Sequence, residues 1–243
     1  MQTDRCKEHA LVLQERIKNH GYAHVPSKVF QQWLGNLSWD KHKNAWDNLE
    51  HDNYATEKGI ARRRAYSRIL FHGKTQTFEP IDNNIFYQSS QINNVFGGVQ
   101  RNFQEVESAF LSSEFLQQTL LLDFSCLPIT QDERRKDWVF GIHQIINYTN
   151  HDQIGLVTPE GIHCDGHRFI IQHFIESFNV LGGDSLIYNR DKKLIEQINL
   201  NEIFETIFLY DERMFHEVTP FFPENKQDIA FRKMLLLDFD LYD

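Results

Sequence analysis

Residues 158–169, TPEGIHCDGHRF, contain the polar side chains whose types and spacing are best suited to chemistry. His163 and Asp165 are separated by one residue, so in an extended segment both side chains project from the same side of the chain. An imidazole nitrogen and a carboxylate oxygen together suit a divalent first-row metal ion. The chain has 12 histidines, so one His-x-Asp pair is also expected by chance, and the metal hypothesis needs further residues.

A third ligand must come from elsewhere in the chain, and His216 in LYDERMFHEVTPF is the strongest candidate. It follows an expected strand and precedes Pro220, which places it near a strand end. Two histidines and one carboxylate leave coordination positions open, as in the non-haem Fe(II) oxygenases. A structural zinc site is closed by four ligands, and Cys6, Cys126 and Cys164 are badly placed for one.

Three further histidines are alternative ligands. His167 lies four residues after His163, a spacing that suits a helix, but the neighbouring glycines argue against a helix here. His143 and His173 are better explained as cavity-lining residues or as hydrogen-bonded histidines of the core.

Arg232 stands near the start of the apolar run AFRKMLLLDFD, an unusual place for a residue that only packs. Its guanidinium offers a fork of donors that matches a carboxylate, and such a contact orients a ligand as well as binding it. A surface arginine, or a structural ion pair with Asp211, Glu212 or Asp238, explains the residue equally well. Strand alternation directs Lys233 to the opposite face.

The elements that must position these residues fall into two parts. In the first part, residues 4–20, the segment PSKVFQQWL and residues 110–124 indicate helices. Residues 39–59 have no clear pattern. After Asp137, short apolar and β-branched runs alternate with Gly, Asn, Asp and Pro; the runs are WVFGIHQIINY, RFIIQHFIESF, SLIYN, TIFLYD and AFRKMLLLDFD.

Several short strands at regular spacing indicate an all-β sandwich or barrel. We therefore expect a single, mainly β domain over residues 1–243. A mainly helical N-terminal part (1–136) would pack on a core (137–243) that carries the metal site. The core would be a double-stranded β-helix, that is, a cupin-like jelly roll.

Composition argues against several classes of function. The formal net charge is −9, and the one basic cluster is RRR at 62–64, in which Arg62 and Arg63 are most simply solvated, so no nucleic-acid partner is expected. No window approaches the roughly 18 apolar residues of a membrane span. The N-terminus lacks the apolar core of a signal peptide. Three scattered cysteines argue against a disulfide framework and favour a reducing, cytoplasmic location.

The order of these motifs resembles that of a known family. VTPEGIHCDGHRF, FNVLGGDSLIYN, LYDERMFHEVTPF and FRKMLLLDF follow one another as in the bacterial Fe(II)/2-oxoglutarate dioxygenases, in the group that includes the L-isoleucine dioxygenases. RRRAYSRI and NNVFGGVQRNF also resemble motifs of the group, so the resemblance spans roughly residues 60–240. Cys164 departs from the group, which often has arginine there; the difference bears on an entrance contact or substrate choice rather than on metal binding.

The resemblance implies roles for the matched residues. His163, Asp165 and His216 would bind Fe(II). Arg232 would hold the distal carboxylate of 2-oxoglutarate. Hydrogen bonds around this co-substrate would come from Gln144, Tyr188 and Thr219. Contacts with the carboxylate of the substrate would come from Arg64, Arg101 and His167.

The resemblance further implies hydroxylation of a small free aliphatic L-amino acid, such as isoleucine, leucine or methionine, with O2 as oxidant and succinate and CO2 as products. Two alternatives stay open: the same chemistry on a larger metabolite or a peptide-bound residue, and a jelly-roll binding or sensor module without turnover. A zinc hydrolase is disfavoured because no glutamate is obviously paired with the three ligands as a general base. The oligomeric state is open, a homodimer being one option.

Overall fold

The computed structural model describes residues 2–35, 37–149 and 153–242. Its helices are α1 (Gln2–His20), α2 (Ser27–Leu34), η1 (Trp39–Trp46), α3 (Asn53–Thr56), α4 (Ser108–Leu111), α5 (Glu114–Cys126), α6 (Gln131–Arg134) and η2 (Asp211–Arg213). Within these described ranges, no helix is long and apolar enough to cross a membrane. The strands are β1 (Tyr22–Val25), β2 (Arg62–His72), β3 (Thr77–Pro80), β4 (Phe86–Tyr87), β5 (Gln100–Arg101), β6 (Asp137–Thr149), β7 (Phe169–Phe178), β8 (Val180–Gly182), β9 (Ser185–Tyr188), β10 (Leu194–Ile198), β11 (Thr206–Leu209), β12 (Phe215–Val218), β13 (Phe221–Pro223) and β14 (Ala230–Leu241).

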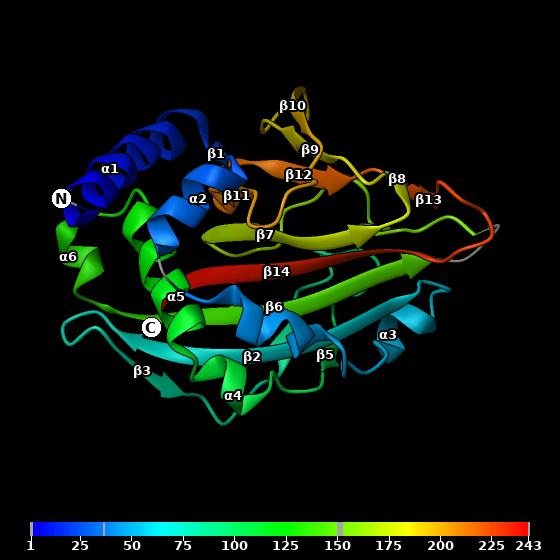
Figure 1. Cartoon of the computed structure of the whole chain (residues 1–243), viewed down its shortest axis with the longest axis horizontal. Coiled ribbons are helices and arrows are strands. Elements are labelled where there is room, and N and C mark those ends of the chain that lie inside the picture. The colour runs from blue at the N-terminus through cyan, green and yellow to red at the C-terminus, as the bar shows by residue number, and fades with distance from the viewer. Residues whose placement is uncertain (1, 36, 150–152, 243) are drawn as a thin grey trace.

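Seven antiparallel strands form the main sheet, in the order β1-β11-β7-β14-β6-β2-β3 (Figure 1). Strands β10, β9 and β12 form a smaller sheet. Ile187 of β9 packs with Phe174 of β7 and Met234 of β14 in one buried cluster, so the smaller sheet lies against the main one. Two facing antiparallel sheets are the architecture of a jelly roll. The prediction of a mainly β fold with such a core is confirmed.

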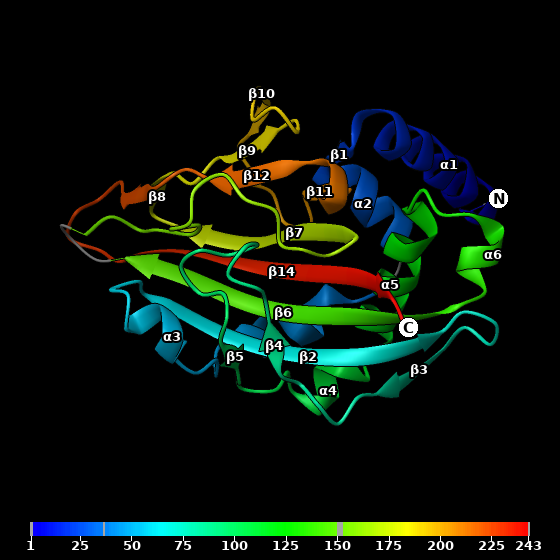
Figure 2. The same cartoon turned by 180° about the vertical axis from the view of Figure 1, so that it is seen from behind.

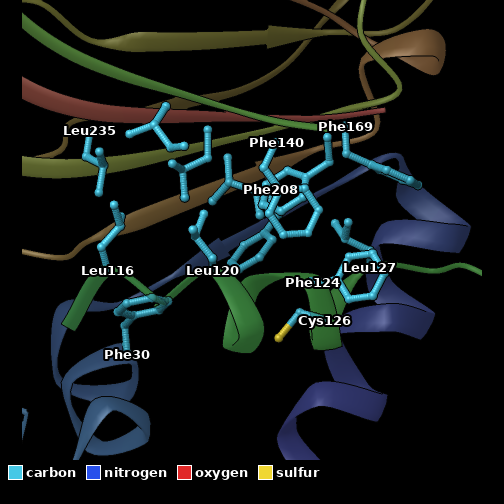
Figure 3. Packing of buried hydrophobic residues seen from close by; sticks show 14 of the residues in the cluster. Phe30, Leu116, Leu120, Phe124, Cys126, Leu127, Phe140, Phe169, Phe208 and Leu235 are labelled. Carbon is cyan, nitrogen blue, oxygen red and sulfur yellow. The ribbon is translucent and has the colours of Figure 1, made fainter. Parts of the chain in front are cut away.

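The helices cover the other face of the main sheet. Leu116 and Phe124 of α5 pack in one cluster with Phe140 of β6 and Leu235 of β14 (Figure 3). Ser113 caps this helix, since its hydroxyl accepts a hydrogen bond from the backbone N–H of Leu116 at 3.2 Å. Fully burying a Leu or Phe side chain contributes roughly 1.5–3 kcal/mol. The helical face therefore stabilises the domain and leaves the opposite face of the sheet for a site.

Within a single strand, alternate side chains face the hydrophobic core and the cavity. Along β14, Leu235 and Leu237 belong to the helix-side core, whereas Arg232, Met234 and Leu236 line a cavity on the other face. Successive side chains of a strand point to opposite faces, so each strand of the main sheet serves both functions.

The first 136 residues contribute strands as well as helices to the domain. Strand β1 forms one edge of the main sheet, and β2 and β3 form the other edge. The sequence of β2 does not show the apolar pattern typical of a strand, because Arg62 and Arg64 interrupt it. In the structure both arginines are buried and line the cavity. The expectation that Arg62 is solvated is therefore wrong: its Nε donates to the buried carboxylate of Asp52 at 2.7 Å.

Candidate active site

The structure brings together the three residues expected to bind a metal ion. His163, in the loop after β6, forms an isolated antiparallel bridge with His216 of β12, in which each backbone N–H donates to the carbonyl of the other (3.0 and 2.8 Å). The carboxylate of Asp165 lies 3.6 Å from Nε2 of His163 and 3.4 Å from Nε2 of His216. One potential ligand atom from each residue lies within 4.8 Å of the others. This donor set fits a divalent metal ion with open coordination positions.

Hydrogen bonds around the three ligands fix their orientation. Nδ1 of His163 donates to the carbonyl of Gly161 at 2.8 Å, which leaves Nε2 free for a metal ion. The buried Nδ1 of His216 has no hydrogen-bond partner among the described residues and lies 3.8 Å from Oδ1 of Asp211. A small movement would therefore pair this nitrogen with Asp211, an acceptor placed where a metal-bound histidine normally has one.

Asp211 also holds the ligand loop. Its carboxylate accepts hydrogen bonds from the backbone N–H groups of Asp165 (3.1 Å), Gly166 (2.8 Å) and His167 (3.2 Å). Gly166 has φ of +86°, a conformation that other residues rarely adopt, so the tight turn after Asp165 requires glycine. The sequence suggested Asp211 only as an ion-pair partner for Arg232, so its place beside the ligands is a finding of the structure.

The charges of the three ligands are mutually dependent. Burial alone would lower the pKa of His163, but contacts with Asp165 and Glu160 outweigh burial and raise the pKa to about 9. Burial alone would raise the pKa of Asp165, but hydrogen bonds with the two histidines hold it well below its usual range. Without a metal ion, the cluster therefore carries a proton that a bound cation would displace.

A cavity extends from these ligands between the sheets to Arg232. Arg232 is 2% exposed, and burial lowers the pKa of its guanidinium to about 10, so it stays charged at neutral pH. Among the described residues, no carboxylate lies within ion-pair distance of it. Asn147 is its cross-strand neighbour on β6, and Ser185 of β9 lines the same cavity. The alternative ion pairs of Arg232 with Asp211, Glu212 or Asp238 are therefore wrong.

The opposite side of the cavity is basic and aromatic. Here the β4–β5 ribbon lies over the face of the main sheet away from the helices (Figure 2). The guanidinium of Arg64 lies 4.7 Å from the ring centre of Phe86 and 4.4 Å from that of Phe103, and that of Arg101 lies 4.7 Å from Phe86. Burial lowers the pKa of Arg64 to about 9 and that of Arg101 to about 10. Both remain cations, and neither has a carboxylate within ion-pair distance in the described part of the chain.

A row of buried polar groups positions Arg64. Nη2 of Arg64 donates to Nδ1 of His143 at 2.6 Å, and Nε2 of His143 donates to Asp238 at 2.7 Å. Burial and the nearby Arg64 lower the pKa of His143 to about 4, so this histidine is neutral. His167 lies beyond the row, where its Nδ1 donates to Asp240 at 2.6 Å. His167 does not line the main cavity but an adjoining smaller pocket, which it shares with Arg64 and Asp165, so its expected contact with the substrate stays a prediction.

Three further residues proposed for the co-substrate lie away from the cavity. Gln144 is on the helix side of β6, where its side-chain amide donates to the carbonyl of Ala45 at 3.1 Å. The hydroxyl of Tyr188 donates to Glu217, because both residues alternate to the outer face of the smaller sheet. The hydroxyl of Thr219 accepts from the N–H of Asp184 at 2.9 Å and closes a loop. The roles expected for Gln144, Tyr188 and Thr219 are not compatible with these positions.

The structure adds one acidic residue to the cavity that the sequence did not indicate. Oε1 of Glu160 lies 3.5 Å from Nε2 of His163, in the loop that carries the ligands. The ground on which a zinc hydrolase was disfavoured, the lack of a glutamate beside the ligands, is therefore wrong.

A family model described as 2OG-Fe dioxygenase matches residues 43–238. An L-isoleucine-4-hydroxylase of Bacillus thuringiensis is 28% identical over 225 residues, which cover 91% of each chain. A 3(1)-hydroxy-L-isoleucine 4-dioxygenase of Pantoea ananatis is 24% identical over 92% of this chain and 93% of the relative. The crystal structure of IDO from Bacillus thuringiensis superimposes with a TM-score of 0.78 at 21% identity, covering 96% of both chains, and it supports the fold.

Proposed function

The chain belongs to the 2OG-Fe dioxygenase family, and on this premise we propose that it hydroxylates an unactivated carbon of a small free aliphatic L-amino acid. The family implies Fe(II) and 2-oxoglutarate as cofactor and co-substrate, with O2 as the oxidant. Two curated relatives that span nine-tenths of the chain are named for isoleucine or hydroxyisoleucine, which supports an aliphatic amino acid as substrate. The cytoplasmic location expected from the scattered cysteines belongs to this proposal as well.

The donor set fits Fe(II). His163 and His216 would bind the metal ion through Nε2 and Asp165 through a carboxylate oxygen, and Asp211 would keep the loop and the His216 ring in place. When bound, Fe(II) supplies the activation of O2, which converts 2-oxoglutarate to succinate and CO2 and places the second oxygen atom on the substrate. The single observation that carries the proposal is the convergence of these three ligands in the cavity that ends at an unpaired arginine.

Arg232 would hold the distal carboxylate of 2-oxoglutarate. A buried guanidinium without an anion is costly, and a dianionic co-substrate would offset that cost. The hydroxyl of Ser185, buried without a hydrogen-bond partner among the described residues, is a second donor for the same carboxylate. Asn147 lines the same end of the cavity and also has an unpaired buried oxygen.

Arg64 and Arg101 would hold the carboxylate of the amino acid. Both are charged, buried and stacked on aromatic rings, so their donors are oriented before a ligand binds. Ile145, Met234 and Leu236 line the cavity as apolar contacts for an aliphatic side chain.

The proposal is tested by incubating the protein with Fe(II), 2-oxoglutarate and O2 and a panel of free amino acids, their peptide amides and larger metabolites. We expect isoleucine, leucine or methionine to stimulate succinate release and to gain one oxygen atom by mass spectrometry. Stimulation confined to peptides or larger metabolites would contradict the proposed substrate class. Absence of any 2-oxoglutarate turnover, with the metal ion and co-substrate bound, would indicate a binding module.

A further inference from the structure

Among the described residues, Glu160 and Asp165 are the two acidic residues that line the cavity. The side chain of Glu160 is 10% exposed, and its Oε2 is buried without a hydrogen-bond partner among the described residues. It does not belong to the group of mutually close metal-ligand atoms, which comprises His163, Asp165 and His216. Its Oε1 lies 3.5 Å from Nε2 of His163, whereas a buried carboxylate oxygen without a partner, such as Oε2, is costly and is available to a cationic ligand.

The loop holds Glu160 in a fixed place. Two residues before it, the hydroxyl of Thr158 accepts from the backbone N–H of Val218 of β12 at 2.9 Å. Three residues after it, His163 bridges to the same strand. Gly161, with φ of +73°, completes the turn. The carboxylate is thus anchored on both sides to the strand that carries the metal ligand His216.

A chain of amide groups connects Glu160 with one of the unpaired arginines. Asn93 Nδ2 lies 3.3 Å from Oε1 of Glu160 and 3.4 Å from Oε1 of Gln88. Nη2 of Arg101 donates to the same oxygen of Gln88 at 2.7 Å. The amide nitrogen of Gln88 donates to the carbonyl of Asp165 at 2.9 Å. A carboxylate whose Oε2 has no partner and a guanidinium without a carboxylate partner, among the described residues, are therefore held at the two ends of a short network fixed to the metal site.

We propose that Glu160 binds the α-ammonium group of the substrate while Arg101 binds its carboxylate, so that the cavity selects a free, unacylated α-amino acid. This inference rests on the function proposed above and adds the residue that recognises the amino group. An anion beside a cation in a buried site complements a zwitterion. An N-acyl group would remove the positive charge and leave Glu160 unpaired, which a buried carboxylate tolerates poorly.

The test measures binding rather than turnover. Isothermal titration calorimetry without O2, on the protein loaded with Mn(II) and 2-oxoglutarate, would compare isoleucine with N-acetylisoleucine and with 3-methylpentanoate, which lacks the amino group. The variants are Glu160→Gln, which keeps the shape and removes the charge, and Glu160→Asp, which keeps the charge. Glu212→Gln, at an exposed position, is the matched control for loss of one carboxylate.

We expect Glu160→Gln to weaken isoleucine binding by about 10- to 150-fold, the equivalent of about 1.5–3 kcal/mol. Binding of 3-methylpentanoate, Mn(II) and 2-oxoglutarate should stay unchanged, and Glu160→Asp should recover part of the loss. Equal weakening of isoleucine and 3-methylpentanoate, loss of Mn(II), or unchanged isoleucine binding would each overturn the inference. If the wild-type protein binds no free amino acid at all, the proposed function fails first, which the wild-type titration alone reveals.

Discussion

Single residues in this cavity stand out by the charges that the protein leaves unpaired. Arg232 and Arg101 are buried without a carboxylate within ion-pair distance among the described residues, and Glu160 has a buried Oε2 without a hydrogen-bond partner there. Arg62 differs, because the carboxylate of Asp52 neutralises it. Uncompensated buried charges destabilise a free protein, so their presence together indicates ligands of matching charge.

Replacing Arg232 should weaken the co-substrate selectively. Arg232→Gln removes a charge-assisted contact, and we expect the KM for 2-oxoglutarate to rise by about 10- to 150-fold with metal content unchanged. Lys233→Gln is the control, because Lys233 lies on the other face of β14, 2.9 Å from Glu176. A KM unchanged in Arg232→Gln would remove this arginine from the co-substrate site.

Asp211 should act on the metal ion through its neighbours. Asp211→Asn changes an acceptor of three backbone N–H groups, and we expect Fe(II) affinity to fall about 10- to 100-fold, as for other residues that orient metal ligands. Metal titration monitored by fluorescence or calorimetry measures the effect, with Glu212→Asn as the control. Full metal affinity in Asp211→Asn would show that the loop keeps its shape without this carboxylate.

At this scale the sequence predicted that His163, Asp165 and His216 come together, but not which residues hold them in place. The spacing of His163 and Asp165 is interpretable because an extended segment places them on one side. Glu160 and Asp211 depend on a turn with a positive φ and on the meeting of two distant loops. Neither the turn nor the contact between the two loops produces a repeating pattern of residue types that the sequence could reveal.

At the scale of elements, strand parity determines which polar side chains reach the cavity. Ser185 and Ile187 of β9 point inward, whereas Tyr188 points outward. The apolar runs of the sequence predicted strands at β6, β7, β9, β11 and β14. They did not predict which side chains of each strand point into the cavity, because apolar residues occupy both faces. The roles of Tyr188 and Gln144, which the resemblance implied, could therefore not be checked against strand faces from the sequence.

Because successive side chains of β9 alternate between its two faces, we expect different effects from the hydroxyls of Ser185 and Tyr188. Ser185→Ala should raise the KM for 2-oxoglutarate by roughly 2- to 10-fold, the value of one hydrogen bond, whereas Tyr188→Phe should leave it unchanged. Steady-state succinate release at varied 2-oxoglutarate measures both. The reverse order of effects would mean that β9 presents its other face to the cavity.

At the scale of the whole molecule, the site is shared between the two halves of the chain. The C-terminal half provides Arg232 and the three residues proposed to bind the metal ion, and the first half provides Arg64 and Arg101. Residues 1–136 were expected to be mainly helical from three helical patterns, and strand β2 was not expected because it begins with three arginines, which have no apolar period. Residues that bind ligands thus interrupt the pattern by which a strand is recognised.

Asp238 links the stability of the whole domain to pH. Burial alone would raise its pKa, but His167, His143 and the N–H of Gly141 outweigh burial and lower the pKa to about 2. An unfolded aspartate has a pKa of about 3.9, so this carboxylate stabilises the fold above that value and loses its contribution as the pH falls toward 2. The contribution is roughly 2–3 kcal/mol.

Chemical denaturation at several pH values tests this linkage. The free energy of unfolding of Asp238→Asn should lie below that of the wild type at pH 6, and the difference should narrow between pH 4 and pH 2. Asp228→Asn, at an exposed position, is the control. A difference that is independent of pH would assign the effect to packing rather than to the charge of Asp238.

The central claim, that this cavity couples oxidation of a free aliphatic amino acid to decarboxylation of 2-oxoglutarate, is tested most directly by turnover under ¹⁸O2. We predict one heavy oxygen atom in the hydroxylated amino acid and one in succinate, formed in equal amounts, and loss of both products in His216→Ala. Heavy oxygen in succinate without any labelled amino acid, or an unchanged yield in His216→Ala, would contradict the account.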